Sequence, residues 1–301
     1  MARKRPPNGC LSSLLLAFLF TALYSFYTAL FCAFLVSGRS AVWVVVVFVA
    51  VFTILWFLAT WCCLTVSLSY LMVPSQRYRL PPALLHQLSL AHNDPIRYNS
   101  ILVQFARERQ LKVRPALCAV NGSTSPIEYL QFCQYCNAIK PFRAEHCGAC
   151  KSCILLIDHH CLMFGTCVGL ANMKAFCLTL FYLSATSLFV FCTALPYLIL
   201  TWTSDTVRTV FIHAVVTVTG AMAAGLCMIG ACTFVCAVRI LIITSKNRSF
   251  GHDNQYDYDL GSRTANLRQM LFGNNLWLAF VPVFSAGTNG YDFVPKTIQS
   301  C

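Results

Sequence analysis

Four long apolar runs dominate the chain, and polar segments separate them. The runs cover residues 11–36, 41–73, 175–201 and 209–243. A helix of about 20 residues crosses the apolar layer of a bilayer, and each run is at least that long. Backbone groups in lipid must hydrogen-bond within their own segment, so helices are expected even where valine dominates. The pattern predicts an all-α integral membrane protein with four transmembrane helices.

Basic residues set the expected orientation of these helices. The polar segment 74–173 holds ten Lys and Arg residues, and the N-terminus begins with Arg3-Lys4-Arg5 after two residues. The positive-inside rule places both in the cytosol. We therefore expect five parts: a cytosolic N-terminus (1–10), two transmembrane helices (11–73), a cytosolic segment (74–174), two more transmembrane helices (175–243) and a cytosolic C-terminal segment (244–301).

Composition supports a membrane protein. The chain is 57% hydrophobic and only 11% charged, which is too apolar for a soluble globular protein of 301 residues. Its net charge of +12 indicates orientation and attraction to anionic lipid, so the bilayer rather than nucleic acid is the expected partner. No internal repeat is obvious in the sequence.

Cysteine and histidine gather in residues 133–167 of the central polar segment. The stretch reads Cys-x2-Cys-x9-His-Cys-x2-Cys-x2-Cys-x4-Asp-His-His-Cys-x5-Cys. Short Cys-x2-Cys turns followed by His and Cys are typical of tetrahedral zinc sites, because a tight turn brings both sulfurs to one metal. Two such sites need eight ligands, which leaves one Cys and one His over. The ten candidates are Cys133, Cys136, His146, Cys147, Cys150, Cys153, His159, His160, Cys161 and Cys167.

Three interpretations of this stretch remain open on spacing alone. A left-over Cys beside a left-over His and Asp158 supplies a nucleophile, a base and an orienting group. A purely structural double zinc site would have no chemistry. A disulfide framework is less favoured, because clustered Cys-x2-Cys pairs with interleaved His suit a metal better than cross-links.

The sequence Asp158-His159-His160-Cys161 inside this frame resembles the DHHC family of protein S-acyltransferases (palmitoyltransferases). The resemblance covers a cysteine-rich domain at about residues 131–176 and, with the expected membrane topology, most of the chain. Further matching positions are Lys140-Pro141-x-Arg143, Val168-Gly169 after Cys167, and Asn172 with Phe176.

The resemblance implies two structural zinc ions and a covalent acyl-enzyme. Cys161 would be the nucleophile, His159 its base and Asp158 the group that orients the His159 ring. Lys140 and Arg143 would face the phosphates of CoA. One zinc would take Cys133, Cys136, His146 and Cys153, and the other Cys147, Cys150, His160 and Cys167.

The expected reaction transfers a long-chain acyl group, palmitoyl first, from acyl-CoA to cysteines of protein substrates. Because the cysteine-rich domain is expected in the cytosol, the substrates would be membrane-associated proteins with cytosolic cysteines. The expected location is the Golgi or endoplasmic reticulum membrane.

The sequence departs from the family pattern at three places. Leu162–Thr166 stands for Pro-Trp-Val-Asn-Asn, Val73–Ser75 for Asp-Pro-Gly, and Thr244–Asn247 for Thr-Thr-x-Glu. These departures keep a catalytically weak, zinc-stabilised membrane scaffold open as an alternative function. A small channel is a second alternative, although no apolar run carries the central charge that marks an ion pathway.

Overall fold

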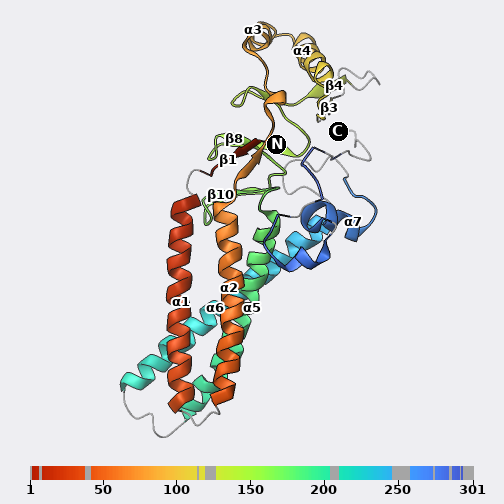
Figure 1. Cartoon of the computed structure of the whole chain (residues 1–301). Helices are drawn as coiled ribbons and strands as arrows, with labels where there is room; N and C mark the ends of the chain where they lie inside the picture. The colour runs from red at the N-terminus through yellow and green to blue at the C-terminus, as the bar shows by residue number, and fades with distance from the viewer. Residues whose placement is uncertain are drawn as a thin grey trace. The chain divides into compact units, whose positions relative to one another are not determined.

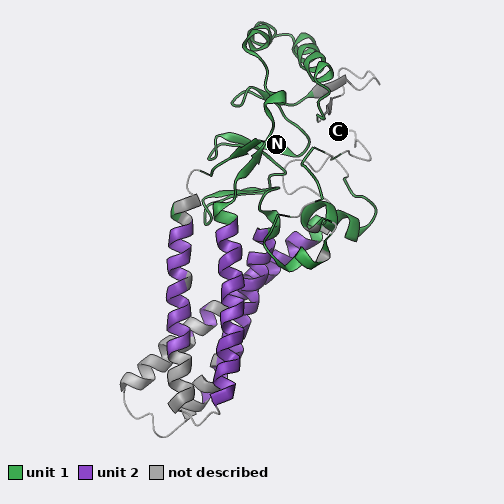
Figure 2. Cartoon of the chain, viewed as in Figure 1, with its two compact units in different colours: residues 1–12, 66–174, 242–301 green, residues 13–65, 175–241 purple. Residues whose placement is uncertain are grey.

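The computed structural model describes residues 2–6, 9–37, 42–113, 115–118, 127–203, 210–245, 258–273, 275–284, 287–291 and 293 (Figure 1). Of the departure at Thr244–Asn247, Lys246 and Asn247 lie outside them. The chain forms two compact units (Figure 2). Unit 1 comprises Met1–Ser12, Val66–Lys174 and Ile242–Cys301, and unit 2 comprises Ser13–Thr65 and Ala175–Leu241.

Long apolar helices make up unit 2. They are α1 (Gly9–Ser37), α2 (Val42–Leu68), α5 (Met173–Thr203) and α6 (Val210–Ser245). A few residues at one end of each helix belong to unit 1. Three described segments are long and apolar enough to cross a membrane, namely Val42–Leu68, Met173–Thr193 and Cys227–Thr244. These helices indicate a membrane protein. In α1 the described apolar segment is the shorter Ser13–Ala29, so the fourth crossing stays a prediction.

Aromatic and small side chains hold α1, α2 and α5 together within unit 2. The Tyr24 hydroxyl of α1 lies 3.1 Å from the Thr53 hydroxyl of α2, and the Tyr24 ring stacks on Phe52. In α2, Cys62 is fully buried in a cluster with Tyr182 of α5. Cys62 is thus a small packing residue, as sequence alone favours for a thiol in an apolar helix.

The helices α5 and α6 approach each other closely at small residues. The Ser184 hydroxyl of α5 lies 2.8 Å from the Thr233 hydroxyl of α6. A Cβ atom added to Gly230 would lie 2.5 Å from the Cβ of Ser187, so only glycine fits there without a shift. Small residues at such crossings allow helix packing in lipid, where burial from water supplies no drive.

Unit 1 contains a small helical cluster. The helices α3 (Pro82–Leu90) and α4 (Pro95–Glu108) follow a short 3₁₀ turn, η1 (Gln76–Tyr78). The Asp94 carboxylate caps α4 by accepting from the amides of Ile96 and Arg97, and Pro95 suits the first helical position. The buried Leu102 and Phe105 of α4 pack with Leu88 of α3 in one apolar cluster.

Short antiparallel strand pairs form the rest of unit 1 up to α5. The cysteine-rich stretch consists of hairpins rather than helices, because a Cys-x2-Cys turn reverses the chain and pairs its two arms. The all-α prediction therefore describes the long helices and does not describe this part. The pairs are β1 (Ala2–Lys4) with β2 (Leu71–Val73), β3 (Pro115–Cys118) with β4 (Ile127–Leu130), β5 (Phe132–Cys133) with β6 (Ala138–Ile139), β7 (Ala144–Cys147) with β8 (Ser152–Leu155), and β9 (His159–Cys161) with β10 (Thr166–Val168).

The C-terminal part of unit 1 is compact but mostly irregular. It contains α7 (Arg263–Leu267), a π-helical turn η2 (Arg268–Phe272) and a 3₁₀ turn η3 (Leu276–Phe280). The buried Asn266 amide accepts from the Leu260 amide and donates to the Asp259 carboxylate. These bonds close the loop that precedes α7.

Candidate functional site

Three hairpins in the cysteine-rich stretch repeat every 14 residues. Cys133, Cys147 and Cys161 are at intervals of 14, and each pairs across its hairpin with the residue five positions later. The register is thus the same in all three hairpins. The partners are Ala138, Ser152 and Thr166. This repeat is absent from the sequence-based description and is the main feature that the structure adds.

Each hairpin turn ends on a residue in the left-handed region of backbone space. The φ angles are 51° for Asn137, 50° for Lys151 and 60° for Gly165. Glycine and asparagine tolerate this conformation best, and a lysine there is strained. The tight turn brings the first and fourth residues of each Cys-x2-Cys unit to the same side, where both sulfurs reach one point.

The eight predicted metal ligands gather in two separate clusters. Within each, one ligand atom per residue lies within 4.8 Å of all the others. A tetrahedral zinc with ordinary Zn–S and Zn–N bonds requires S···N separations of about 3.6 Å. The separations here are 3.3 Å for Cys136 to His146 Nδ1 and 3.5 Å for Cys167 to His160 Nδ1. The clusters, which could each hold a metal ion, are Cys133, Cys136, His146 and Cys153, and Cys147, Cys150, His160 and Cys167.

Each cluster joins two successive hairpins. Cys133 and Cys136 of the first hairpin meet His146 and Cys153 of the second, and the second supplies two thiols to the third in the same way. Burial raises the pKa of the Cys153 thiol, so a bound cation would be needed to keep it deprotonated. A metal in each cluster would therefore cross-link the three hairpins into one body.

Cys161 occupies the position of a metal ligand in the third hairpin but belongs to neither cluster. The second cysteine of the turn is replaced by Phe164, which is completely buried. In the second hairpin the Cys150 amide donates to the Cys147 sulfur at 3.3 Å. The Phe164 amide donates to the Cys161 sulfur in the equivalent place. The third turn keeps the amide donor of a metal knuckle and loses the second thiol.

His159 and Asp158 lie beside Cys161, as the sequence predicts. His159 Nδ1 donates to Asp158 Oδ2 at 2.8 Å, and the ring also hydrogen-bonds Cys161. The bonds to Asp158 and then Cys161 raise the pKa of His159 to about 9. Burial acts to raise the pKa of Cys161, but the bonds from His159 and Phe164 outweigh it, and this pKa lies below its ordinary value. The pair therefore favours a thiolate beside an imidazolium.

Arg143, a predicted CoA contact, is buried among side chains of the C-terminal part of unit 1. Its guanidinium is buried, 5.2 Å from the ring centre of Tyr258 and 4.8 Å from that of Phe293, and its Nη1 donates to the Met270 sulfur at 3.5 Å. Cation–π contacts of this kind attach the C-terminal part of unit 1 to the cysteine-rich stretch. The CoA role of Arg143 stays a prediction.

Lys140, the other predicted CoA contact, forms an ion pair with Glu145 in the second hairpin. The Lys140 side chain is 18% exposed and that of Glu145 is 40% exposed. The ammonium is thus already neutralised by a carboxylate, which a phosphate would have to displace. The CoA role of Lys140 also stays a prediction.

Sequence reasoning did not identify two residues, Asn172 and Lys4, whose side chains hydrogen-bond the backbone around the metal-binding clusters. The Asn172 amide is buried; its oxygen accepts from the Gly169 amide, and its nitrogen donates to the carbonyls of Cys167 and Val66. Lys4 Nζ donates to the carbonyls of Cys150 at 2.7 Å and Lys151 at 3.0 Å. Asn172 was visible only as a matching family position, and Lys4 only as a basic flank.

Known proteins resemble this chain over the same region. A family model described as DHHC palmitoyltransferase matches residues 127–254. The chain is 31% identical to "Palmitoyltransferase ZDHHC20" of Homo sapiens over 199 residues. This aligned region covers 65% of this chain and 51% of that protein. It is also 26% identical to "Palmitoyltransferase ZDHHC15A" of Danio rerio over 284 residues. This aligned region covers 90% of this chain and 79% of that protein.

The match to the human relative thus spans about half of that protein's length. The family match includes all three hairpins, both metal-binding clusters and the Asp158-His159-Cys161 group. The part of the chain that carries the hairpins and clusters is therefore similar to the DHHC palmitoyltransferase family.

Proposed function

We propose that this chain is a membrane-bound protein S-acyltransferase, which moves a long-chain acyl group from acyl-CoA to cysteines of protein substrates. The observation that carries the proposal is the position of Cys161. It occupies a ligand position of a metal knuckle, lies outside both metal-binding clusters and hydrogen-bonds His159, which in turn donates to Asp158. Relatives over this region are named palmitoyltransferases.

In the first step, the Cys161 thiolate attacks the thioester carbonyl of acyl-CoA. A new carbon–sulfur bond forms at Cys161, the bond to the CoA sulfur breaks, and the His159 imidazolium gives its proton to the departing CoA thiolate. Asp158 keeps the His159 ring in the orientation that allows this transfer. The Phe164 amide stabilises the Cys161 thiolate before the attack.

In the second step, neutral His159 takes the proton of the substrate cysteine. The resulting thiolate attacks the Cys161 thioester, the acyl group moves to the substrate, and the Cys161 thiolate leaves. One thioester replaces another in each step, so the energy needed is small and positioning accounts for most of the catalysis.

Two structural zinc ions complete the proposal. Each would be held by three cysteines and one histidine in a closed tetrahedral site, where it supplies folding energy rather than Lewis acidity. Three thiolates around a divalent ion leave each site with a negative formal charge. Activation of Cys161 is therefore assigned to His159 and the Phe164 amide.

Contacts within unit 1 support a four-helix topology. The strand β1, which precedes α1, pairs with β2, which follows α2. This pairing supports a topology in which both ends of the helix pair are on one side of the membrane and the chain crosses an even number of times between them. Lys174, at the start of α5, likewise bonds the Leu278 and Val283 carbonyls, which follow α6. With the basic residues of the segment 74–173, this supports cytosolic termini and the five predicted parts.

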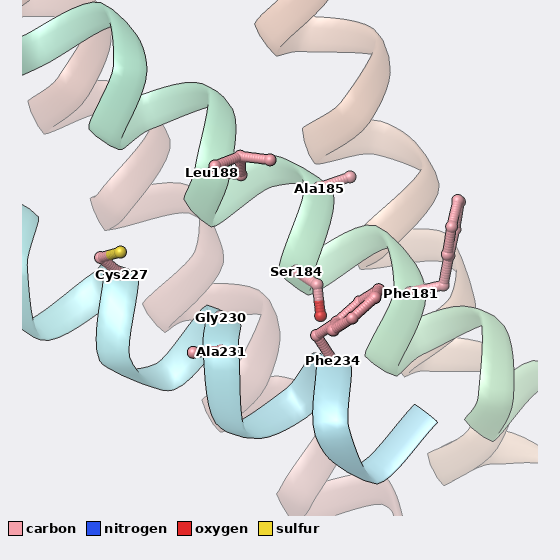
Figure 3. A pocket seen from close by; sticks show the side chains of 8 residues that line it. All are labelled: Phe181, Ser184, Ala185, Leu188, Cys227, Gly230, Ala231 and Phe234. Carbon is pink, nitrogen blue, oxygen red and sulfur yellow. The ribbon is translucent and has the colours of Figure 1, made fainter. Parts of the chain in front are cut away.

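Apolar features support a long-chain acyl group, of which palmitoyl is the first choice. Within unit 2, an apolar pocket of about 370 Å³ lies between α5 and α6, bordered by Phe181, Leu188 and Phe234 (Figure 3). Leu162 and Met163, which follow Cys161, are 87% and 52% exposed. Burial stabilises a hydrocarbon chain by about 0.8 kcal/mol per CH₂, so a long chain gains most from apolar surroundings.

The expected acceptors are membrane-associated proteins with cytosolic cysteines. Their thiols must reach Cys161, which precedes the first residue of α5 by only 12 positions and so must act close to the membrane surface. The predicted location is the Golgi or endoplasmic reticulum membrane.

Intact-mass analysis of the purified protein after incubation with palmitoyl-CoA tests the proposal. We expect an acyl adduct on the wild type and on the matched control Cys236→Ala, which removes an exposed cysteine of α6. We expect no adduct on Cys161→Ala and two zinc ions on all three proteins. An adduct that persists on Cys161→Ala would exclude this nucleophile. Zinc without any adduct would favour the scaffold suggested by the departures at Leu162–Thr166.

A further inference from the structure

An exposed apolar surface lies on the C-terminal part of unit 1. Trp277 is 91% exposed, Phe280 64%, Val283 44% and Phe284 47%. These side chains belong to η3 and the four residues that follow it, and together they are named the C-terminal apolar segment. Four large exposed apolar groups lie within eight residues of the chain, and a concentration of exposed apolar surface usually marks an interaction site.

Hydrogen bonds within the chain fix part of the backbone of this segment. The Asn275 carboxamide oxygen accepts from the Trp277 amide at 3.1 Å and caps η3. The Val281 amide donates to the Leu278 carbonyl, and the Val283 amide to the Val281 carbonyl. These bonds give the amides of Trp277, Val281 and Val283 partners within the chain, as a lipid environment requires of backbone groups.

A buried lysine attaches this segment to the start of a membrane-crossing helix. Lys174 is the second residue of α5 and of the candidate span Met173–Thr193. Its side chain is 6% exposed, and its ammonium group donates to the carbonyl of Leu278 and to that of Val283 at 3.2 Å. The segment is therefore held beside the residue at which the apolar part of α5 begins.

We propose that the C-terminal apolar segment inserts Trp277, Phe280, Val283 and Phe284 into the cytosolic interface of the bilayer. The span Met173–Thr193 fixes where the membrane surface lies, and Lys174 holds the segment at that end of the span. Tryptophan prefers this depth because its ring is apolar and its indole N–H requires a polar partner. The segment has too few residues to cross the membrane and suffices to lie in its surface.

The bilayer fits this surface better than a protein partner does. A partner protein would have to bind with its apolar groove at the end of α5, next to the membrane. The membrane surface itself is already present at that place. The proposal depends on the membrane crossing of α5 and not on acyl transfer. It assigns the segment the task of fixing the depth and tilt of unit 1 at the membrane.

The depth of Trp277 can be measured by fluorescence quenching in lipid nanodiscs. The chain has five tryptophans, so the difference between wild type and Trp277→Phe isolates the Trp277 emission. We expect lipids brominated near the headgroup to remove about half of that emission, and aqueous iodide to have little effect. Leu90→Trp in the Trp277→Phe background is the control for an exposed indole, since Leu90 is 68% exposed and ends α3.

Two results would overturn the proposal. Quenching of Trp277 by iodide to the same extent as in Leu90→Trp would place it in water. Protection from both iodide and brominated lipid would place it against a protein surface, in a second copy or a bound partner. Zinc content and the acyl adduct of Trp277→Phe, measured on the same samples, separate these results from a failure of the proposed enzyme.

Discussion

Replacement of Asn172 by alanine should loosen the hold of the second metal-binding cluster on its cation. The Asn172 amide makes three hydrogen bonds to backbone groups while being 1% exposed. One of them fixes the carbonyl of Cys167, whose sulfur belongs to the cluster. Asn172→Ala removes all three bonds and leaves buried backbone groups of Gly169, Val66 and Cys167 to find water.

The size of this effect follows from the three bonds. Each contributes about 1 kcal/mol net, so the loss is about 3 kcal/mol, and an unsatisfied buried partner adds to it. If the whole loss of about 3 kcal/mol lowers the free-energy barrier to zinc release, that release should become roughly 100-fold faster, because about 1.4 kcal/mol corresponds to a factor of ten.

Zinc release into excess of a colorimetric chelator measures the effect. We expect two equal phases for the wild type, with only one of them accelerated by Asn172→Ala. The bond from Asn172 reaches Cys167 in the third hairpin, which supplies ligands to the second cluster and none to the first. Gln134→Ala, which truncates an exposed side chain in the first knuckle, is the matched control and should leave both phases unchanged. Wild-type release from Asn172→Ala would refute the supporting role of these bonds.

Three further predictions concern Arg143, Lys4 and the α5–α6 crossing. Arg143→Lys should make the C-terminal part of unit 1 several-fold more sensitive to limited proteolysis, because lysine stacks poorly between two rings. A raised KM for acyl-CoA with unchanged proteolysis would instead support a phosphate-binding role for Arg143. Lys4→Gln should cost about 1–2 kcal/mol and speed zinc release from the second cluster only; equal acceleration of both phases would contradict it. Gly230→Ala should lower the thermal midpoint in detergent, since overpacking costs about 1–3 kcal/mol, while Gly225→Ala, which meets nothing within 4 Å, should not.

The apolar runs predicted the long helices because run length alone encodes a membrane helix. The described helix α2, for instance, lies within the run 41–73 and ends near the first proline that follows. The hairpins left no such signal, since strands of two to four residues are too short to show alternation. Their existence follows from the Cys-x2-Cys turns, but their pairing register does not.

The metal-binding clusters and the hidden repeat show where sequence reasoning stopped. Ligand spacing predicted eight ligands among ten candidates, the family resemblance implied the two sets of four, and the structure gathers each of these sets into a group that could hold a metal ion. The interval of 14 residues was visible in Cys133, Cys147 and Cys161, but Phe164 breaks the Cys-x2-Cys pattern in the third unit. Aligning the three units by their first cysteine would have identified Cys161 as a knuckle position without its second thiol.

Arg143 illustrates a second limit of sequence reasoning. A basic residue near a reactive cysteine suggests an anion partner, whereas its contacts in the structure are Tyr258, Met270 and Phe293. These partners are more than 100 residues away in the chain, so no local pattern announces them. Sequence reasoning therefore gave no indication of these packing contacts, and the CoA role of Arg143 stays a prediction.

The discontinuity of unit 1 dictates an order of assembly during synthesis. All eight cluster ligands lie within residues 133–167, so the hairpins can take up metal before α5 has left the ribosome. The partners of Arg143 and the carbonyls that bind Lys174 emerge only after α6 has been made. A nascent chain therefore passes through a stage in which its metal sites are complete and its C-terminal contacts are missing. Quality control that recognises exposed apolar surface would act at that stage, on a chain whose metal-binding clusters are already formed.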